Sequence, residues 1–362
     1  MSVDYAARIG RARSAMAGAG VDSLLLSVGP DLPYFTGYDA PQLERLTMAV
    51  LAADGRATLV VPRLEAMKVT DVGAYEILPY DETDDPVAMV ARLVGEARHV
   101  AIGDKTWAVF VMALQESMSG AAFRKASDIT ASLRAIKDAA EIEELAAAGA
   151  ASDRVAGRLA GARFAGRTEK ELAAEVRAMC EDEGHDKGWD PIVGSGPNGA
   201  SPHHGAGDRV IAQGDTVVID FGGTIGGYHA DTTRTFSVGE PSSEVATAYA
   251  VLMEAQRSGV DSAVVGTEAQ GVDRATRSII DTGGYGDLFI HRTGHGIGLD
   301  IHEDPYIVEG NRQVLEAGMA FTVEPGIYRP GEWGMRIEDV VVATDDGPRN
   351  LNMASHELVV VA

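Results

Sequence analysis

The pattern of apolar and polar positions divides the chain into two regions of different character. In the first region, short apolar runs typical of strands alternate with amphipathic segments typical of helices. This alternation predicts an α/β domain over residues 1–130. We expect strands in VDSLLLSV, MAVLAADGRATLVVP and HVAIGD, and helices that begin near Tyr5, Leu64, Pro86 and Thr106.

Two helices are predicted near the start of the second region, which we place at residues 131–362. The charged, alanine-rich stretch DAAEIEELAAAGAASDRVAGRLAG has few apolar residues larger than Ala or Val, and we interpret it as the junction helix. In TEKELAAEVRAMCEDEG, Thr168 is followed three residues later by Glu171. This spacing is typical of a capping box at a helix N-terminus.

From residue 190 onward glycine is dense and short β-branched runs dominate. We interpret DTVVIDFGG, GYHADTTRTFSV, MAFTVEPGIY and MRIEDVVVAT as antiparallel strands and hairpins, with helices near residues 242–259 and 267–282. The second region is therefore predicted to be an α+β domain.

Composition narrows the class of protein. The 362 residues are 45% hydrophobic, without an apolar run long enough to span a membrane, so we expect a globular cytoplasmic protein. Cys180 is the only cysteine, which excludes an intrachain disulfide and a cysteine zinc cage. The net charge of −23 disfavours nucleic acid and anionic membranes as partners. Residues 1–135 carry 13 basic and 17 acidic residues, which leaves 18 and 37 for residues 136–362.

A few of these carboxylates interrupt apolar runs. Asp220 ends TVVID, and Asp231 follows eleven residues later across the turn GGTIGG, so the two can face each other in a hairpin. Glu324 ends the run AFTVE. Glu338 lies in RIEDVVV, where a period of two places it on the same face as Arg336. Four acidic side chains are thus predicted at buried strand positions.

A buried carboxylate costs several kcal/mol unless it is paired or bound to metal. Only Arg234 and Arg336 are near candidates for pairing, whereas two divalent cations would balance four carboxylates. His295, between glycines in HRTGHGIGLDIHE, is a candidate fifth ligand. The oxygen-rich set favours Mn²⁺ or Co²⁺ over a structural zinc. His291 and His302 would then support the site or bind substrate, although structural histidines beside a glycine turn are the alternative.

The segments VVIDFGGTIGGYHADTTRTF, HRTGHGIGLDIHEDP, FTVEPGIY and GMRIEDVVV resemble the pita-bread metallopeptidases of family M24. This family includes Xaa-Pro dipeptidase (prolidase), aminopeptidase P and methionine aminopeptidase. Upstream, PDLPYFTGY is similar to the creatinase/prolidase N-terminal domain, which methionine aminopeptidases usually lack. The resemblance implies such an N-terminal domain followed by a pita-bread catalytic domain.

The resemblance also implies roles for the five candidate ligands. Asp220 would bind one metal ion, Asp231 and Glu338 would bridge two ions, and His295 and Glu324 would complete the second site. Glu324 would in addition relay protons. The expected ions are two Mn²⁺, with Co²⁺ or Zn²⁺ as alternatives.

Further roles concern the substrate. By the same resemblance His291 and His302 line the cleft, and His302 stabilises the oxyanion. The family has one histidine where this chain has two in SGPNGASPHHGAGDR. Spacing from the following GD turn favours His203, but the adjacent His204 stays open.

Three more residues complete the candidate set. Arg336 matches an arginine that supports the metal-site carboxylates in the family. Trp189 and Tyr228 are aromatic candidates for the wall that receives the proline ring, although buried aromatic residues are more often ordinary core.

The implied reaction is hydrolysis of Xaa-Pro peptide bonds in small peptides by a homodimer. A dipeptidase must bind the free substrate carboxylate, for which Arg292, Arg336, or Arg45 of a dimer mate are candidates. The chain is shorter than a typical aminopeptidase P, which favours Xaa-Pro dipeptidase over an Xaa-Pro aminopeptidase that acts on longer peptides. A metal-free creatinase-type hydrolase and a non-catalytic binding module are less favoured, because such relatives lose metal ligands.

Overall fold

The computed structural model describes residues 3–362 and divides the chain into two compact units. The first unit extends to Arg134 and the second covers residues 135–362. Among the described residues, no helix combines the length and the apolar character that crossing a membrane requires.

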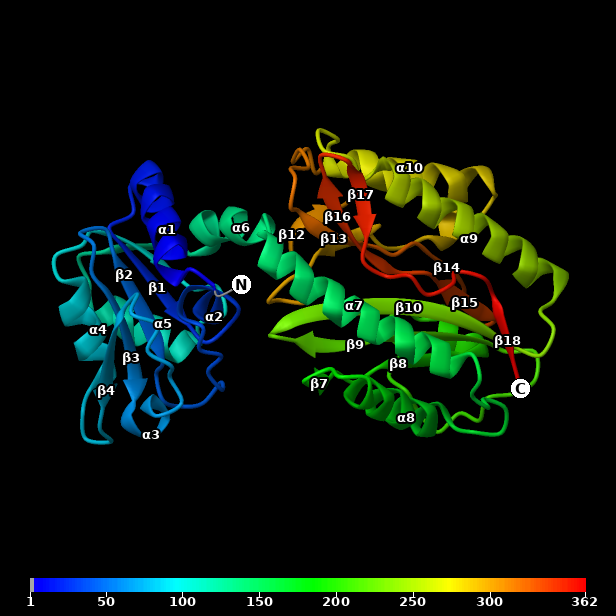
Figure 1. Cartoon of the computed structure of the whole chain (residues 1–362), viewed down its shortest axis with the longest axis horizontal. Helices are drawn as coiled ribbons and strands as arrows, with labels where there is room; N and C mark the ends of the chain where they lie inside the picture. Colours follow the sequence, from blue (N-terminus) through cyan, green and yellow to red (C-terminus); the bar gives the residue numbers. More distant parts are fainter. Residues whose placement is uncertain (1–2) are drawn as a thin grey trace. The chain divides into compact units, whose positions relative to one another are not determined.

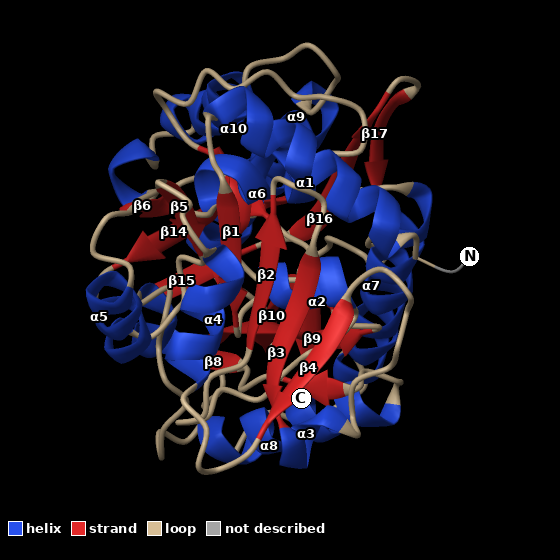
Figure 2. Ribbon diagram, turned by 90° about the vertical axis from the view of Figure 1, so that its left-hand side faces the viewer, coloured by secondary structure: helices blue, strands red, loops and turns tan. Residues whose placement is uncertain are grey.

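The first unit contains a six-stranded sheet in the order β4-β3-β2-β1-β5-β6. The β1–β2 and β2–β3 pairs are antiparallel and the other pairs are parallel, so the unit is a mixed α/β sheet. Figure 2 shows β2, β3 and β4 side by side. The strands are β1 (Ser23–Ser27), β2 (Met48–Ala52), β3 (Ala57–Pro62), β4 (Glu76–Tyr80), β5 (His99–Ile102) and β6 (Ala122–Lys125). The helices are α1 (Tyr5–Ala19), α2 (Asp31–Thr36), α3 (Arg63–Ala66), α4 (Pro86–Val94), α5 (Ala108–Ser117) and α6 (Ser127–Ala135).

Most of the elements predicted for this unit are confirmed. Helices α1 and α4 begin at Tyr5 and Pro86 as expected, and α5 begins two residues after Thr106. The run predicted over MAVLAADGRATLVVP forms two strands, β2 and β3, because the sequence ADG supplies a turn between them. The sequence did not predict α2, β4, β6 or α6, which are short elements with weak apolar periodicity.

The second unit is built from two larger sheets and a two-stranded ribbon. The first sheet has the order β18-β10-β9-β7, with β8 also paired to β9, and the second has the order β12-β11-β13-β16-β17. The ribbon is β14–β15. The strands are β7 (Lys187–Gly188), β8 (Ile192–Ser195), β9 (Thr216–Ile225), β10 (Tyr228–Val238), β11 (Gly294–Gly296), β12 (Glu303–Ile307), β13 (Ala320–Val323), β14 (Gly326–Arg329), β15 (Trp333–Arg336), β16 (Asp339–Thr344), β17 (Gly347–Asn350) and β18 (Val359–Val361).

Four long helices cover these sheets. Helix α7 lies across β9 and β10 (Figure 1) and packs with α8 in one apolar core, whereas α9 and α10 pack on β13, β15 and β16. Capping boxes begin α7 at Asp138 and Glu141 and α8 at Thr168 and Glu171, the second as predicted. The helices are α7 (Ala139–Leu159), α8 (Glu169–Asp182), α9 (Ser243–Ser262) and α10 (Ala269–Thr282), with short 3-10 turns η1 (Gly196–Ala200) and η2 (Gly286–Leu288).

The predicted β9–β10 hairpin is confirmed. Gly226 and Gly227 both have positive φ, at 57° and 82°, which a two-residue hairpin turn with the correct twist requires. Val217, Ile219 and Phe221 of β9 pack against the helices. The alternate residue Asp220 therefore points to the opposite face of the sheet.

Two predicted strands are interrupted. MAFTVEPGIY forms β13 and β14 with Glu324 and Pro325 between them, and MRIEDVVVAT forms β15 and β16 with Ile337 and Glu338 between them. Each segment, interpreted from the sequence as strands and hairpins, is divided because the chain leaves one sheet and enters another there. Both breaks place a glutamate between two strands, where Glu338 makes an isolated bridge with Thr233 and the Glu324 amide donates to the Thr293 carbonyl oxygen.

His185 is a buried histidine remote from these breaks, and it gives the fold a pH dependence. Its Nε2 atom lies 3.3 Å from Ser152 Oγ, and its Nδ1 atom has no hydrogen-bond partner. Burial lowers the pKa of His185 to about 4. The imidazole of the unfolded chain takes up its proton near pH 6.5, whereas folded His185 stays neutral down to about pH 4. The folded state is therefore fully stable with respect to this group above pH 6.5 and loses stability as the pH falls toward 4.

The wild type should lose unfolding free energy as the pH falls from 7 to 4.5. We expect this loss to be smaller by about 2 kcal/mol in His185→Gln. Urea unfolding of both proteins in the presence of a chelator at the two pH values measures this difference. Parallel pH dependence of the two proteins would contradict the assignment.

Candidate metal centre

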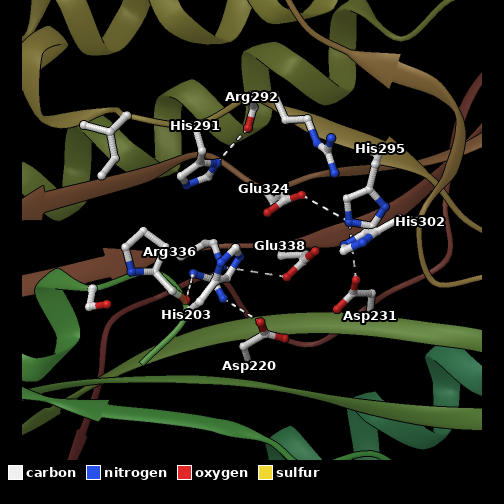
Figure 3. A pocket seen from close by; sticks show the side chains of 13 residues that line it. His203, Asp220, Asp231, His291, Arg292, His295, His302, Glu324, Arg336 and Glu338 are labelled. Carbon is white, nitrogen blue, oxygen red and sulfur yellow. Dashed lines mark hydrogen bonds and ion pairs between the residues drawn. The ribbon is translucent and has the colours of Figure 1, made fainter. Parts of the chain in front are cut away.

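A pocket of about 580 Å³ opens within the second unit, where the hairpin and the two strand breaks meet. All five predicted ligands line it, together with five of the predicted supporting and substrate residues (Figure 3). The lining residues are Ser201, Pro202, His203, Asp220, Asp231, Ile290, His291, Arg292, His295, His302, Glu324, Arg336 and Glu338.

Strand periodicity explains how the carboxylates reach this pocket. Asp220 is opposite Thr233 in the β9–β10 register and Asp231 is opposite Gly222, so both aspartates lie on the face away from the α7–α8 core. Phe321 and Val323 pack toward α10, so Glu324 continues the alternation on the pocket side. Four acidic side chains from separate segments thus converge.

The closest grouping is Asp231, His295 and Glu338, whose ligand atoms all lie within 4.8 Å of one another. His295 Nε2 lies 3.3 Å from Glu324 Oε1 and 3.6 Å from Asp231 Oδ2. Its Nδ1 atom lies 3.0 Å from the Gly296 carbonyl oxygen, a contact that directs Nε2 toward the carboxylates. This arrangement is typical of a metal-binding histidine.

Arg336 is a buried cation that contacts the carboxylates directly. Its Nη2 atom donates to Asp220 Oδ2 at 2.6 Å, and its Nε atom lies 3.9 Å from Glu338 Oε2. The guanidinium also donates to Thr233 Oγ1 at 3.0 Å and to Tyr328 Oη at 3.1 Å. Thr233 in turn donates to Glu338 Oε2 at 2.6 Å. Arg336 is therefore fully engaged in holding the cluster together.

One guanidinium does not balance four carboxylates, of which Asp220, Asp231 and Glu338 are buried and Glu324 is partly buried. Burial, followed by repulsion from Glu338 and Asp220, raises the pKa of Asp231 well above its usual value. Burial and repulsion from Glu324 do the same to the pKa of Glu338. Burial raises the pKa of Glu324 to about 7, although Arg336 opposes the shift, and burial also raises the pKa of Asp220 against the same arginine. The carboxylates of the cluster therefore carry more negative charge than Arg336 alone can balance.

The residues fit a divalent metal centre. Asp220 Oδ1 is buried without a hydrogen-bond partner, a state that costs free energy unless the oxygen meets a cation. Burial lowers the pKa of His295 to about 3, which keeps the imidazole neutral and able to bind metal. Carboxylate oxygens and one imidazole form a donor set suited to Mn²⁺, Co²⁺ or Zn²⁺.

Three further histidines lie at the pocket. His302 packs edge-to-face on His295, with ring centroids 4.1 Å apart. His291 has both ring nitrogens within hydrogen-bonding distance of partners, with Nδ1 2.7 Å from the Arg292 carbonyl oxygen and Nε2 2.9 Å from Tyr328 Oη. His203 lines the pocket, whereas His204 does not and instead places Nε2 2.8 Å from Glu169 Oε2. The geometry thus favours His203 over His204.

The two aromatic candidates do not line the pocket. Tyr228 is buried and donates to Glu141 Oε1 of α7 at 2.7 Å, and Trp189 Nε1 lies 3.4 Å from the Ala230 carbonyl oxygen. Because neither side chain lines the pocket, the geometry does not support their role as a proline-binding wall, which stays a prediction. The apolar lining comes from Pro202 and from Ile290, which is 64% exposed.

Several supporting residues of the pocket were not predicted from the sequence. Thr233 holds Glu338, and its position two residues after Asp231 was a usable signal, since both share one strand face. Thr322 Oγ1 donates to Glu324 Oε1 at 3.2 Å and accepts from the His295 amide at 3.1 Å. Tyr328 joins Arg336 to His291 across the β14–β15 ribbon, and no spacing in the sequence indicates that contact.

Comparison with known proteins gives matches over nearly the whole chain. Residues 134–345 match the profile of Metallopeptidase family M24, and residues 8–136 match the Creatinase/Prolidase N-terminal domain. The "Probable dipeptidase PepE" of Mycobacterium tuberculosis is 45% identical over 99% of this chain and 96% of its own length.

Solved structures agree with these matches. The recombinant prolidase of Thermococcus sibiricus has a TM-score of 0.95 and 36% identity, with full coverage of both chains. The X-Pro aminopeptidase of Thermotoga maritima has a TM-score of 0.83 and 30% identity, covering 96% of this chain and 100% of its own. The proteins similar to this chain thus include both a prolidase and an X-Pro aminopeptidase.

Proposed function

This chain belongs to metallopeptidase family M24, with an N-terminal domain of the creatinase/prolidase type, and on that basis we propose that it hydrolyses Xaa-Pro dipeptides. The carrying observation is the convergence of three buried carboxylates, the partly buried Glu324 and His295 in a pocket with a deficit of positive charge. The similarity to PepE and to an archaeal prolidase supports the dipeptide substrate.

Asp220, Asp231, His295, Glu324 and Glu338 would hold two divalent ions, with Mn²⁺ as our first candidate. Bound there, the ions would acidify a water molecule and polarise the scissile carbonyl. Arg336 and Thr233 keep Glu338 and Asp220 in place, so the donor atoms are arranged before an ion binds.

Glu324 is our candidate for proton transfer. Its carboxylate faces the pocket, and Thr322 fixes the Oε1 atom that approaches His295. In this role Glu324 Oε2 takes a proton from the attacking water and delivers it to the imide nitrogen of proline. His302, which lies against His295, would donate a hydrogen bond to the oxyanion, and His203 and His291 would complete the walls of the cleft.

Arg292 is our candidate for recognition of the substrate carboxylate. Arg336 already pairs with Asp220, and Arg45 already pairs with Glu44 and Glu82 in the first unit. Arg292 lines the pocket with its guanidinium 4.5 Å from the ring centre of Tyr306, and no hydrogen bond or ion pair of that guanidinium occurs among residues 3–362. Its donors are therefore available to a free carboxylate.

We expect Arg292→Met to raise KM for Ala-Pro by about 10- to 100-fold, because a charge-assisted hydrogen bond to the substrate is lost. Activity on Ala-Pro-amide, which has no carboxylate, should stay within about twofold of the wild type, since the interaction does not exist there. Steady-state kinetics on both substrates give the comparison. Equal losses on the two substrates would contradict this role.

The proposed function is tested by Mn²⁺-dependent turnover on a panel of Xaa-Pro dipeptides and on Ala-Pro-Ala. We expect hydrolysis of the dipeptides and a lower kcat/KM for the tripeptide. A strong preference for Ala-Pro-Ala would instead support the second candidate, an Xaa-Pro aminopeptidase, which the similarity to the Thermotoga maritima enzyme favours. A homodimer remains our prediction, and light scattering of the purified protein tests it.

A further inference from the structure

A buried carboxylate with several hydrogen-bond partners lies outside the pocket, at the start of α8. Glu169, the first residue of this helix, has no exposed surface. Its Oε1 atom accepts from the Ser195 amide at 2.9 Å, from Ser195 Oγ at 2.7 Å and from Asn198 Nδ2 at 3.0 Å. Its Oε2 atom accepts from the Gly207 amide at 3.3 Å and lies 2.8 Å from His204 Nε2. A single carboxylate therefore contacts a segment from residue 195 to residue 207 at four points.

This carboxylate is not needed to begin the helix. Thr168 and Glu171 already form a reciprocal capping box there. Burial alone would raise the pKa of Glu169, but the hydrogen bonds from Ser195, His204 and Asn198 outweigh it and lower the pKa. The hydrogen bonds from the surrounding loop thus favour the charged form of Glu169.

The loop carries His203 between two fixed points. On one side, His204 is held by Glu169. On the other side, the Pro202 carbonyl oxygen accepts from Arg336 Nη1 at 3.3 Å, which connects the loop to the carboxylate cluster of the pocket. Residues 201–204 form a turn, in which the His204 amide donates to the Ser201 carbonyl oxygen at 3.1 Å, so binding His204 to the scaffold fixes the turn that carries His203 into the pocket.

The base of the loop is fixed as well. Arg209 Nη1 donates to Ser195 Oγ at 2.6 Å and to Asp215 Oδ2 at 2.6 Å. Ser195 thus lies between Glu169 and the Arg209–Asp215 ion pair. Among the described residues, this network is connected to the predicted metal ligands only indirectly, through Arg336. A change at Glu169 should therefore leave metal binding intact.

We propose that Glu169 is a positioning residue that acts through His204 to fix His203 against the substrate, a role that rests on the proposed peptidase function. The adjacent histidines then have separate tasks. His204 anchors the loop, and His203 contacts the substrate.

A double-mutant cycle with Glu169→Gln and His203→Gln tests this role on the Mn²⁺-loaded enzyme, with Ala-Pro as substrate. Each single variant should lower kcat/KM by at least about tenfold. The double variant should resemble His203→Gln alone, because Glu169 has nothing left to position. Glu171→Gln is the matched control, since Glu171 lies on the same helical turn with an exposed carboxylate, and it should keep kcat/KM within about twofold of the wild type.

A second readout does not depend on activity. Hydrogen exchange followed by mass spectrometry should show faster exchange over residues 195–207 in Glu169→Gln than in Glu171→Gln, with the β9–β10 hairpin unchanged. Calorimetric Mn²⁺ affinity should be the same in the two variants within about twofold.

The possible failures are distinguishable. If the wild type turns over Ala-Pro but the two losses multiply in the double variant, or if exchange over residues 195–207 does not change, the positioning role is wrong while the proposed function stands. If the wild type hydrolyses no Xaa-Pro peptide with Mn²⁺, the proposed function itself is wrong, and the role of Glu169 falls with it.

Discussion

Replacing Glu324 with glutamine is expected to lower kcat for Ala-Pro by about 10³-fold or more. Glutamine preserves the shape of the side chain but removes both the negative charge offered to a metal ion and the oxygen that takes the proton. The geometry supports both roles, because Glu324 lies between Thr322 and His295 at the break between β13 and β14. Steady-state kinetics with saturating Mn²⁺ measure the effect.

A second measurement on Glu324→Gln distinguishes a loss of catalysis from a loss of folding. Because burial raises the pKa of Glu324 to about 7, its charge destabilises the metal-free protein near neutral pH. Metal-free Glu324→Gln should therefore resist urea at least as well as the wild type. Glu332→Gln, at an exposed position on the turn between β14 and β15, is the control and should retain full activity. Activity of Glu324→Gln within tenfold of the wild type would contradict the role.

Arg336→Met is expected to have the largest effect on stability. The guanidinium contacts Asp220, Thr233 and Tyr328, and its loss leaves buried carboxylates without their cation. Breaking such a buried pair costs about 3–5 kcal/mol of unfolding free energy. Urea unfolding of the metal-free proteins measures the loss.

The matched control for Arg336 is Arg349→Met. Arg349 pairs with Glu143 at 3.2 Å, but both side chains are largely exposed, so the change in unfolding free energy should be a small fraction of that for Arg336. Similar losses in the two variants would mean that the buried cluster contributes no more than a surface ion pair.

Parts of the fold and of the pocket could be predicted because they depend on local patterns. The run TVVID, the glycine turn and the eleven-residue spacing place Asp220 and Asp231 on one face of a hairpin whatever surrounds it. Capping residues mark the start of α8 in the same way. The structure brings all five predicted ligands together, while their binding of metal remains a proposal.

The remainder depends on partners that are distant in the sequence. The orientation of the Tyr228 side chain is fixed by its hydrogen bond to Glu141, which lies 87 residues away in the sequence. The orientation of the His204 side chain is fixed by its contact with Glu169. Strand periodicity also could not show that the chain changes sheets at Glu324 and at Glu338. Sequence patterns therefore predicted which residues face the interior, but tertiary contacts decide which of them reach the pocket.

The central claim is that divalent ions hold the buried carboxylates together. Calorimetric titration of chelator-treated protein with Mn²⁺, with unfolding and turnover followed at the same ion concentrations, tests it most directly. We predict two ions bound per chain, a gain of about 2.7 kcal/mol in unfolding free energy per site at 100 times Kd, and turnover that rises with occupancy. A folded protein that binds no divalent ion, or whose activity does not depend on one, would contradict the account.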